Sequence, residues 1–161
     1  MPNKLLVFGA TLSAIAALLH VGCIYFGAPW YRFFGAGEEL AQLAEAGSWI
    51  PGLITAGIAL VLGIWALYAL SAAGAIRRLP LLRTVLCIVT GIYLLRGLAA
   101  LPVAVLQPEQ ATAFLWWSSA ICLGFGLVHL VGLRQRWPVL SARHGRANSG
   151  AHPPHASSPS A

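Results

Sequence analysis

Ionisable side chains and thiols stand out in this sequence because they interrupt long apolar runs. His20 and Cys23 lie three residues apart in LLHVGCIYF, His129 lies in FGLVHLVGL, and Arg96 lies in IYLLRGLAA. Imidazoles and thiolates are ligands for haem and transition metals, and a guanidinium binds carboxylate or phosphate groups. Whether these residues form a site depends on the elements that carry them.

Several familiar chemistries do not fit these residues. A haem held by two histidines needs His20 and His129 at one level, but a rise of 1.5 Å per residue separates them by about 16 Å of depth. Cys23, Cys87 and Cys122 fall on three different apolar segments, without the CxxC pair of a disulfide oxidase. No phosphate-binding loop and no nucleophile with an evident base is visible. The sequence therefore predicts no cofactor and no metal, and it favours a non-enzymatic role.

Composition places the chain in a bilayer. Of 161 residues, 58% are hydrophobic and 9% are charged, against roughly 25% charged in an average globular protein. Four windows are apolar enough, at more than roughly 18 residues, to span a membrane. They cover residues 5–26, 50–71, 81–101 and 114–133. The sequence therefore predicts an all-α, integral membrane four-helix bundle formed by residues 1–136.

The third window contains Arg96, which costs about 2.5 to 3.5 kcal/mol at a helix centre. The positive charges nevertheless support it. Four spans place Lys4 and seven arginines on one side and Arg32 alone on the other, whereas three spans give an even division. The positive-inside rule then predicts a bacterial inner-membrane protein with both termini in the cytoplasm. A cleaved signal segment ending before Cys23 is a weaker alternative, because IYFGAPWYRFF continues the apolar run.

His20 and Arg96 are predicted to lie at similar depth. Counted from the cytoplasmic ends of their helices, they stand roughly 22 Å and 24 Å into the membrane. His20 and Cys23 also follow the small residues Gly9, Ser13 and Ala16 along one helix face, which is expected to face the bundle. An outward-facing polar pocket is predicted from six residues at this level: His20, Thr55, Tyr93, Arg96, Ser118 and Ser119. The alternative is a histidine hydrogen-bonded within the bundle and a cysteine that only packs.

The first outer loop is predicted to contain a short amphipathic helix. Residues 35–47, GAGEELAQLAEAG, begin with glycine, carry glutamates in the first turn and space Leu40 and Leu43 three apart. Glu38, Glu39 and Glu45 are candidate counter-charges for Arg96. The alternative is that Arg96 only fixes the topology and binds nothing.

The end of the chain is predicted to be a disordered cytoplasmic tail, residues 137–161, because apolar periodicity stops there. Four arginines near this membrane boundary are predicted to contact anionic lipid headgroups: Arg134, Arg136, Arg143 and Arg146. His144, His152 and His155 do not have the spacing of an ordered metal site. The net charge of +6 is explained by orientation and lipid attraction, so nucleic acid is not an expected partner.

Three segments, FFGAGEEL, IRRLPLLR and LLRGLAALP, resemble small four-span bacterial inner-membrane proteins without an assigned function, over residues 1 to about 136. The resemblance implies a location and no activity. Two hypotheses follow from the residues themselves. The chain is a non-enzymatic component that associates with a membrane-protein partner, a second copy or lipid, or it is a carrier or binding protein for a small anionic or amphiphilic molecule at the outer pocket.

Overall fold

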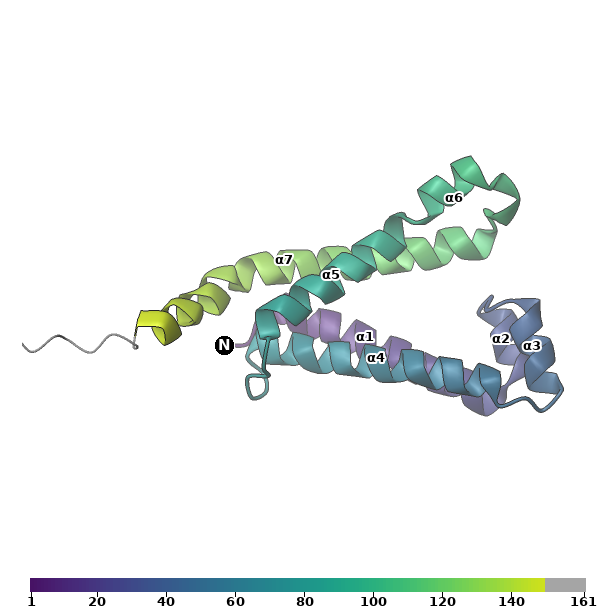
Figure 1. The fold of residues 1–161 in the computed structure, drawn as a ribbon, viewed down its shortest axis with the longest axis horizontal. Helices are drawn as coiled ribbons and strands as arrows, with labels where there is room; N and C mark the ends of the chain where they lie inside the picture. The colour runs from purple at the N-terminus through teal and green to yellow at the C-terminus, as the bar shows by residue number, and fades with distance from the viewer. Residues whose placement is uncertain (150–161) are drawn as a thin grey trace, which may run out of the picture.

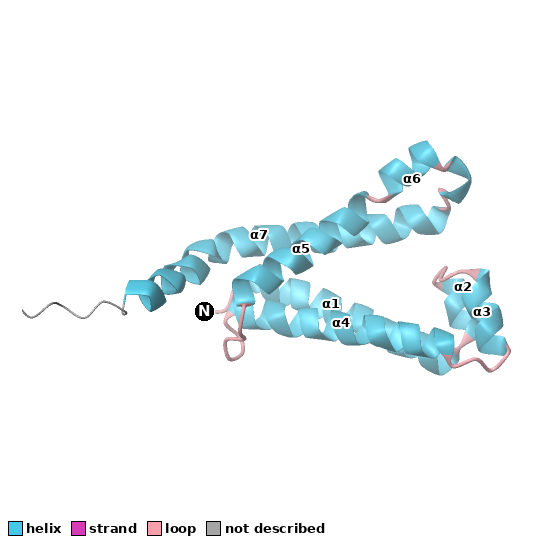
Figure 2. Cartoon of the chain, viewed as in Figure 1, coloured by secondary structure: helices cyan, strands magenta, loops and turns pink. Residues whose placement is uncertain are grey.

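The computed structural model describes residues 1–149, apart from the side chains of Gln110 and residues 142–149. The described chain folds into helices joined by short loops (Figure 2). Four segments have the length and hydropathy to cross a membrane: Lys4–Phe26, Ile50–Ala73, Leu82–Leu106 and Ala113–Ser141. The prediction of an all-α chain with four membrane-length apolar helices is confirmed, and the chain is described below as a polytopic membrane protein.

The four spans form two antiparallel pairs. Helix α1 (Lys4–Phe26) packs along α4 (Ile50–Ala73), and α5 (Leu82–Leu98) packs along α7 (Ala113–Ser149). Figure 1 shows that the pairs meet near the N-terminus and diverge toward their opposite ends. Within the described residues, no Cα atom of α1 lies within 8 Å of one of α5, so these two helices occupy diagonal positions.

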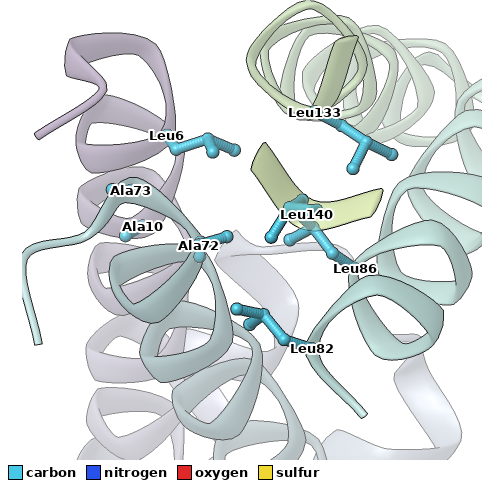
Figure 3. Close-up of a cluster of buried hydrophobic side chains, with 9 residues drawn as sticks. Leu6, Ala10, Ala72, Ala73, Leu82, Leu86, Leu133 and Leu140 are labelled. Atoms are coloured by element: carbon cyan, nitrogen blue, oxygen red, sulfur yellow. The ribbon is translucent and has the colours of Figure 1, made fainter. Parts of the chain in front are cut away.

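A core of leucines and alanines holds the two pairs together at the convergent end (Figure 3). Leu6, Leu86 and Ala69 are completely buried there. Asn3 fastens the same end, because its side chain caps α1 by accepting from the Leu6 amide at 2.9 Å. The backbone N–H of Asn3 also donates to Ala73 O at 2.9 Å, and its side-chain amide donates to Gln135 at 2.7 Å. One residue thus links α1, α4 and α7.

Large apolar side chains cover the outside of the spans. Leu18, Leu60 and Leu95 are 69%, 66% and 72% exposed in the isolated chain. Such a surface is unfavourable in water and is matched to lipid tails, which are as apolar as leucine. Burial therefore agrees with hydropathy in placing the four helices in a membrane.

Short helices cover the divergent end. The predicted amphipathic helix is present as α3 (Glu38–Glu45), and a further helix, α2 (Ala28–Phe33), precedes it. Gly27, at φ 69°, allows the chain to turn from α1 into α2. The loop after α2 contacts the other helix pair, because Gly35 packs directly against the side chain of Phe114 at the start of α7.

Two parts of the spans differ from the predicted boundaries. The third span is interrupted at Ala99 and continues as α6 (Ala100–Leu106), followed by the single turn η1 (Pro108–Gln110). Pro102 explains the break, because it has no N–H to donate to the Leu98 carbonyl and its ring crowds that oxygen.

Helix α7 is longer than the predicted fourth span. Residues 137–149 are helical, which differs from the disordered tail expected from residue 137. Packing supplies the reason, since Leu140 is 4% exposed within the core and Arg83 lies 4.0 Å over the ring of Trp137. Residues 150–161, with His152 and His155, lie outside the described residues.

Candidate functional site

Arg96 is a charged residue in the third span, where side-chain hydrogen bonds hold it. It lies in the last turn of α5 and is half-buried. Its Nη1 donates to Ser119 Oγ at 3.0 Å, and its Nη2 donates to Ser118 Oγ at 2.9 Å. We call Arg96, Ser118 and Ser119 the Arg96 cluster. Three of the six residues predicted for the outer pocket are therefore in direct contact.

Close packing of α5 against α7 positions this cluster. A Cβ atom on Gly97 would lie 2.6 Å from both the Cα and N atoms of Leu123, so only glycine permits this approach. Gly126 has a similar role one turn further on, where a Cβ atom would lie 2.7 Å from Leu94. The backbones are thus close enough for Arg96 to reach the first turns of α7.

The acids predicted to neutralise Arg96 bind a different arginine. Arg32 in α2 pairs with Glu38 at 2.7 Å and with Glu45 at 2.5 Å. These hydrogen bonds lower the pKa of the Glu38 and Glu45 carboxyls and raise the pKa of Arg32. Among the described side chains, Arg32 makes the ion pairs to acids, and neither these two acids nor Glu39 pairs with Arg96. The expectation of a glutamate counter-charge at Arg96 is thus corrected, because Arg32 lies in the same loop and competes locally.

His20 does not join the Arg96 cluster. Its Nδ1 lies 2.7 Å from the carbonyl of Ala16, one turn back on α1, so Nδ1–H is the donor. Helix α1 is diagonal to α5, which separates the two backbones although the residue counts place them at similar depth. This geometry answers the question posed by LLHVGCIYF: His20 is bonded within its own helix, and Cys23 packs with Ala28 and Tyr31.

Thr55 fixes the short helices of the divergent end to α4. Its hydroxyl donates to the carbonyl of Pro51 at 2.7 Å, which leaves the oxygen to accept the Tyr31 hydroxyl at 3.1 Å. Both Thr55 and Tyr31 are buried. Thr55 therefore belongs to the packing of α2 and not to the Arg96 cluster.

Tyr93 belongs to a second polar group deeper in the bundle. Its hydroxyl lies 2.9 Å from Ser13 Oγ on the diagonal helix α1, and its ring lies 5.3 Å from that of His129 on α7. We call Ser13, Tyr93 and His129 the inner polar cluster. Trp65 and Phe125 pack edge-on against Tyr93, so aromatic rings enclose the cluster.

His129, like Ser13, belongs to this cluster but was not among the six residues predicted for the outer pocket. It is completely buried, and its Nδ1–H donates to the Phe125 carbonyl at 2.8 Å. Its Nε2 has no hydrogen-bond partner in the described structure. The imidazole packs on Gly9, where a Cβ atom would lie 2.8 Å from Cε1. A signal was present, since Gly9 and Ser13 are four residues apart on the small-residue face of the first helix.

The arginines predicted to contact lipid gather at the convergent end. Arg134 is exposed, and Arg136 is half-buried with its Nε–H donating to the Ala72 carbonyl at 3.1 Å. The side chains of Arg143, His144 and Arg146 lie outside the described part of the structure. In residues that the structure describes, no three His, Cys, Asp or Glu side chains group as metal ligands, and all three cysteines are free thiols.

Comparison of the chain with protein-family models, with curated proteins and with solved structures gives no match. The resemblance to small four-span bacterial proteins therefore stays a prediction. Functional inference rests on the two polar clusters and on the surface of the helices.

Proposed function

We propose that this protein is a membrane-embedded binding protein or carrier for an anionic amphiphile, whose charged group is held by the Arg96 cluster. The observation that carries the proposal is the state of Arg96. It lies in a span, is half-buried, and is bonded to two serine hydroxyls with no acid in ion-pairing distance among the described residues.

The chemistry of the cluster suits an anion. A guanidinium at membrane depth is costly unless it is paired or hydrated, so it favours a negatively charged partner. The two serines use one N–H from each Nη nitrogen, and the remaining N–H groups are available for a carboxylate or phosphate. The Ser119 hydroxyl can also turn toward an anion, and the Ser118 hydroxyl can do so by giving up its bond to the Leu115 carbonyl at 3.2 Å.

The surroundings of the cluster suit an apolar tail. Leu95 and Leu98, on either side of Arg96 along α5, are 72% and 47% exposed to the surface that lipid would cover. A ligand with its charged group at Arg96 therefore has apolar surface beside it. This favours an amphiphile over a small hydrophilic anion.

Thermal unfolding of the purified protein in a neutral detergent tests the proposal. A long-chain fatty acid and a lysophospholipid with an anionic headgroup are compared with a zwitterionic lysophospholipid of the same chain length. Loss of a charged hydrogen bond costs about 1.5 to 3 kcal/mol, so Arg96→Gln is expected to weaken binding of the anionic amphiphiles by about tenfold or more.

Arg32→Gln is the matched control, because it removes the same charge from the same end of the molecule outside the cluster. Its affinity for the anionic amphiphiles should equal that of the native protein. The double variant Ser118→Ala with Ser119→Ala should have an affinity between those of the native protein and Arg96→Gln. Equal binding by the native protein and Arg96→Gln would overturn the proposal.

A second role, association with a helix of a partner or of another copy, is favoured by a groove between α1 and α4. The groove has a volume of about 480 Å³, and Ala56, Ala59 and Gly63 form its floor. Small residues allow helices to approach closely in lipid. A Cβ atom on Gly63 meets nothing within 4 Å, so Gly63→Leu should extend into the groove without disturbing the fold. Chemical cross-linking in native membranes should lose a partner band in this variant.

We also propose the orientation with the convergent end in the cytoplasm of a bacterial inner membrane. Its support is the charge asymmetry, with Arg77, Arg78, Arg83 and Arg134 at that end and Arg32 at the other. Reporter fusions after residues 40, 78, 107 and 161 should read outside, inside, outside and inside. An outside reading at residue 161 would contradict it.

A further inference from the structure

We propose a second binding site, distinct from the Arg96 cluster: a pocket at the convergent end that binds the phosphate group of an anionic phospholipid. The pocket has a volume of about 150 Å³ and lies between the end of α4, the loop 74–81 and α7. Arg78 from the loop and Arg136 from α7 line it, together with Ser71 and Gly74.

Arg136 is held in a fixed orientation toward the pocket. Its Nε–H donates to the Ala72 carbonyl at 3.1 Å, which also satisfies a carbonyl at the C-terminal end of α4. Its Nη2 lies 3.0 Å from the position that a Cβ atom on Gly74 would occupy. Gly74 is also at φ 83°, so both backbone conformation and space call for glycine. The Nη groups of Arg136 make no hydrogen bond within the described residues and are available to a ligand.

The loop that carries Arg78 is held by Ser71. The Ser71 hydroxyl donates to the Arg77 carbonyl at 3.0 Å and accepts from the Leu79 amide at 2.9 Å. These two bonds fix the backbone on both sides of Arg78. Its guanidinium makes no ion pair within the described residues, whereas Arg32 at the other end has two.

Charge at this end favours an anion. The acids Glu38, Glu45 and Glu109 lie in α3 and η1, at the opposite end of the spans. Two arginines that line one pocket without a carboxylate are typical of phosphate binding, because each guanidinium presents a planar fork of donors.

The remaining walls identify the phosphate as part of a lipid. Ile76, Leu82, Val139 and Leu140 supply apolar surface beside the two arginines. This mixed lining suits a headgroup phosphate with its glycerol and acyl chains next to it. A soluble phosphate ion would leave that surface without a partner.

The experiment compares the native protein with two variants that each lack one positive charge. Full-length native protein, Arg78→Gln and Arg77→Gln are reconstituted in nanodiscs of phosphatidylcholine with increasing phosphatidylglycerol, and lipid affinity is measured by native mass spectrometry. Arg77 is the neighbouring arginine, is exposed, and does not line the pocket. Since one arginine near anionic lipid contributes about a fivefold change in affinity, Arg78→Gln should bind phosphatidylglycerol about fivefold more weakly and Arg77→Gln should match the native protein.

Inorganic phosphate, titrated against the same three proteins in phosphatidylcholine alone, distinguishes the two sources of the phosphate group. If phosphate raised the thermal stability of the native protein but not of Arg78→Gln, and phosphatidylglycerol were not bound selectively, the lipid assignment would be overturned. The pocket would then be a site for a soluble anion. Equal losses in Arg78→Gln and Arg77→Gln would overturn the pocket itself, because they indicate general attraction to charge. Arg136→Lys should show a weakened affinity while its thermal unfolding confirms that it folds.

Discussion

The inner polar cluster and the Arg96 cluster both place ionisable side chains at membrane depth, but the two clusters differ in how deeply the surrounding helices bury them. His129 is completely buried where the two helix pairs converge, on Gly9 and beside Tyr93. Arg96 is half-buried and is held by Ser118 and Ser119. His129 is fully enclosed by side chains, whereas Arg96 retains N–H groups that have no partner among the described residues.

The difference follows from helix arrangement and not from residue type. Small residues such as Gly9 close the space around His129, so no ligand can reach its unpartnered Nε2 in this conformation. The last turn of α5, which carries Arg96, packs against α7, and Figure 1 shows that the other helix pair diverges toward this end. An intramembrane ionisable residue therefore indicates a binding site when a ligand can reach its polar atoms, and a packing role when a ligand cannot.

The largest effect on stability is expected at His129. His129→Ala leaves a cavity in a fully buried position and should lower the free energy of unfolding by about 2 to 4 kcal/mol. His129→Leu keeps the volume and should cost less than about 1.5 kcal/mol, because the lost Nε2 had no partner. Unfolding by SDS in mixed micelles measures both. A leucine variant as unstable as the alanine variant would show that the imidazole has a role beyond packing.

Gly97 should have the next largest effect, and it connects packing to the Arg96 cluster. Gly97→Ala forces a methyl group into the backbone of Leu123 and should cost about 1 to 3 kcal/mol of unfolding free energy. The same variant should lose amphiphile binding, because α5 and α7 separate beneath Arg96. Gly91→Ala on the same helix is the control, since a Cβ atom there meets open space and alanine favours the helix by about 0.5 to 1 kcal/mol.

A smaller effect is expected from the hydrogen bond between Ser13 and Tyr93. Polar contacts between membrane helices average about 0.6 kcal/mol and reach about 1.7, so Tyr93→Phe should fall within that range. Ser13→Ala should cause most of the same loss, and the double variant should lose little more than either alone. Additive losses would separate the two residues and weaken the description of the inner polar cluster as one unit. Amphiphile binding should stay unchanged in all three variants.

The four spans and the three residues of the Arg96 cluster could be predicted from the sequence. Apolar length and charge asymmetry identify the helices, and residue counting places Arg96 level with Ser118 and Ser119. The same counting also placed His20 and Tyr93 there. It could not show that α1 is diagonal to α5, nor that a histidine would bond the carbonyl four residues earlier. Depth is a property of one helix, whereas a site requires the rotation and neighbours of two.

The partners of the α3 glutamates and the length of α7 could not be predicted from the sequence, for related reasons. The charge pattern does not reveal that α2 turns Arg32 toward Glu38 and Glu45, so it points to the distant Arg96 as their partner. The polar composition after residue 136 concealed Leu140, whose burial extends the helix past the membrane span. In both cases a local tertiary contact outweighs the average character of the segment.

The smallest effect is expected at Arg32, and it sharpens the contrast between an arginine that has acids and one that does not. Arg32 lowers the pKa of the Glu38 and Glu45 carboxyls below their ordinary value of 4.5, so the unfolded segment binds protons more readily than the folded one. The stabilisation is therefore complete above pH 4.5 and is lost as the pH falls through the lowered pKa values. Because these side chains are exposed, the effect should be confined to α2 and α3.

Hydrogen exchange of the α3 amides between pH 3 and pH 6, corrected for the intrinsic rate, should show this loss of protection in the native protein. Arg32→Gln should remove the pH dependence, whereas Glu39→Gln should keep it, because Glu39 makes no ion pair with Arg32. The same Arg32→Gln protein releases two carboxylates at the divergent end of the spans. If either glutamate then reached Arg96, binding of an anionic amphiphile would weaken, and the separation between the two arginines would be lost. Unchanged binding is the expected result, since the glutamates lie in α3 at the end of the α1 and α4 pair, whereas Arg96 lies between α5 and α7.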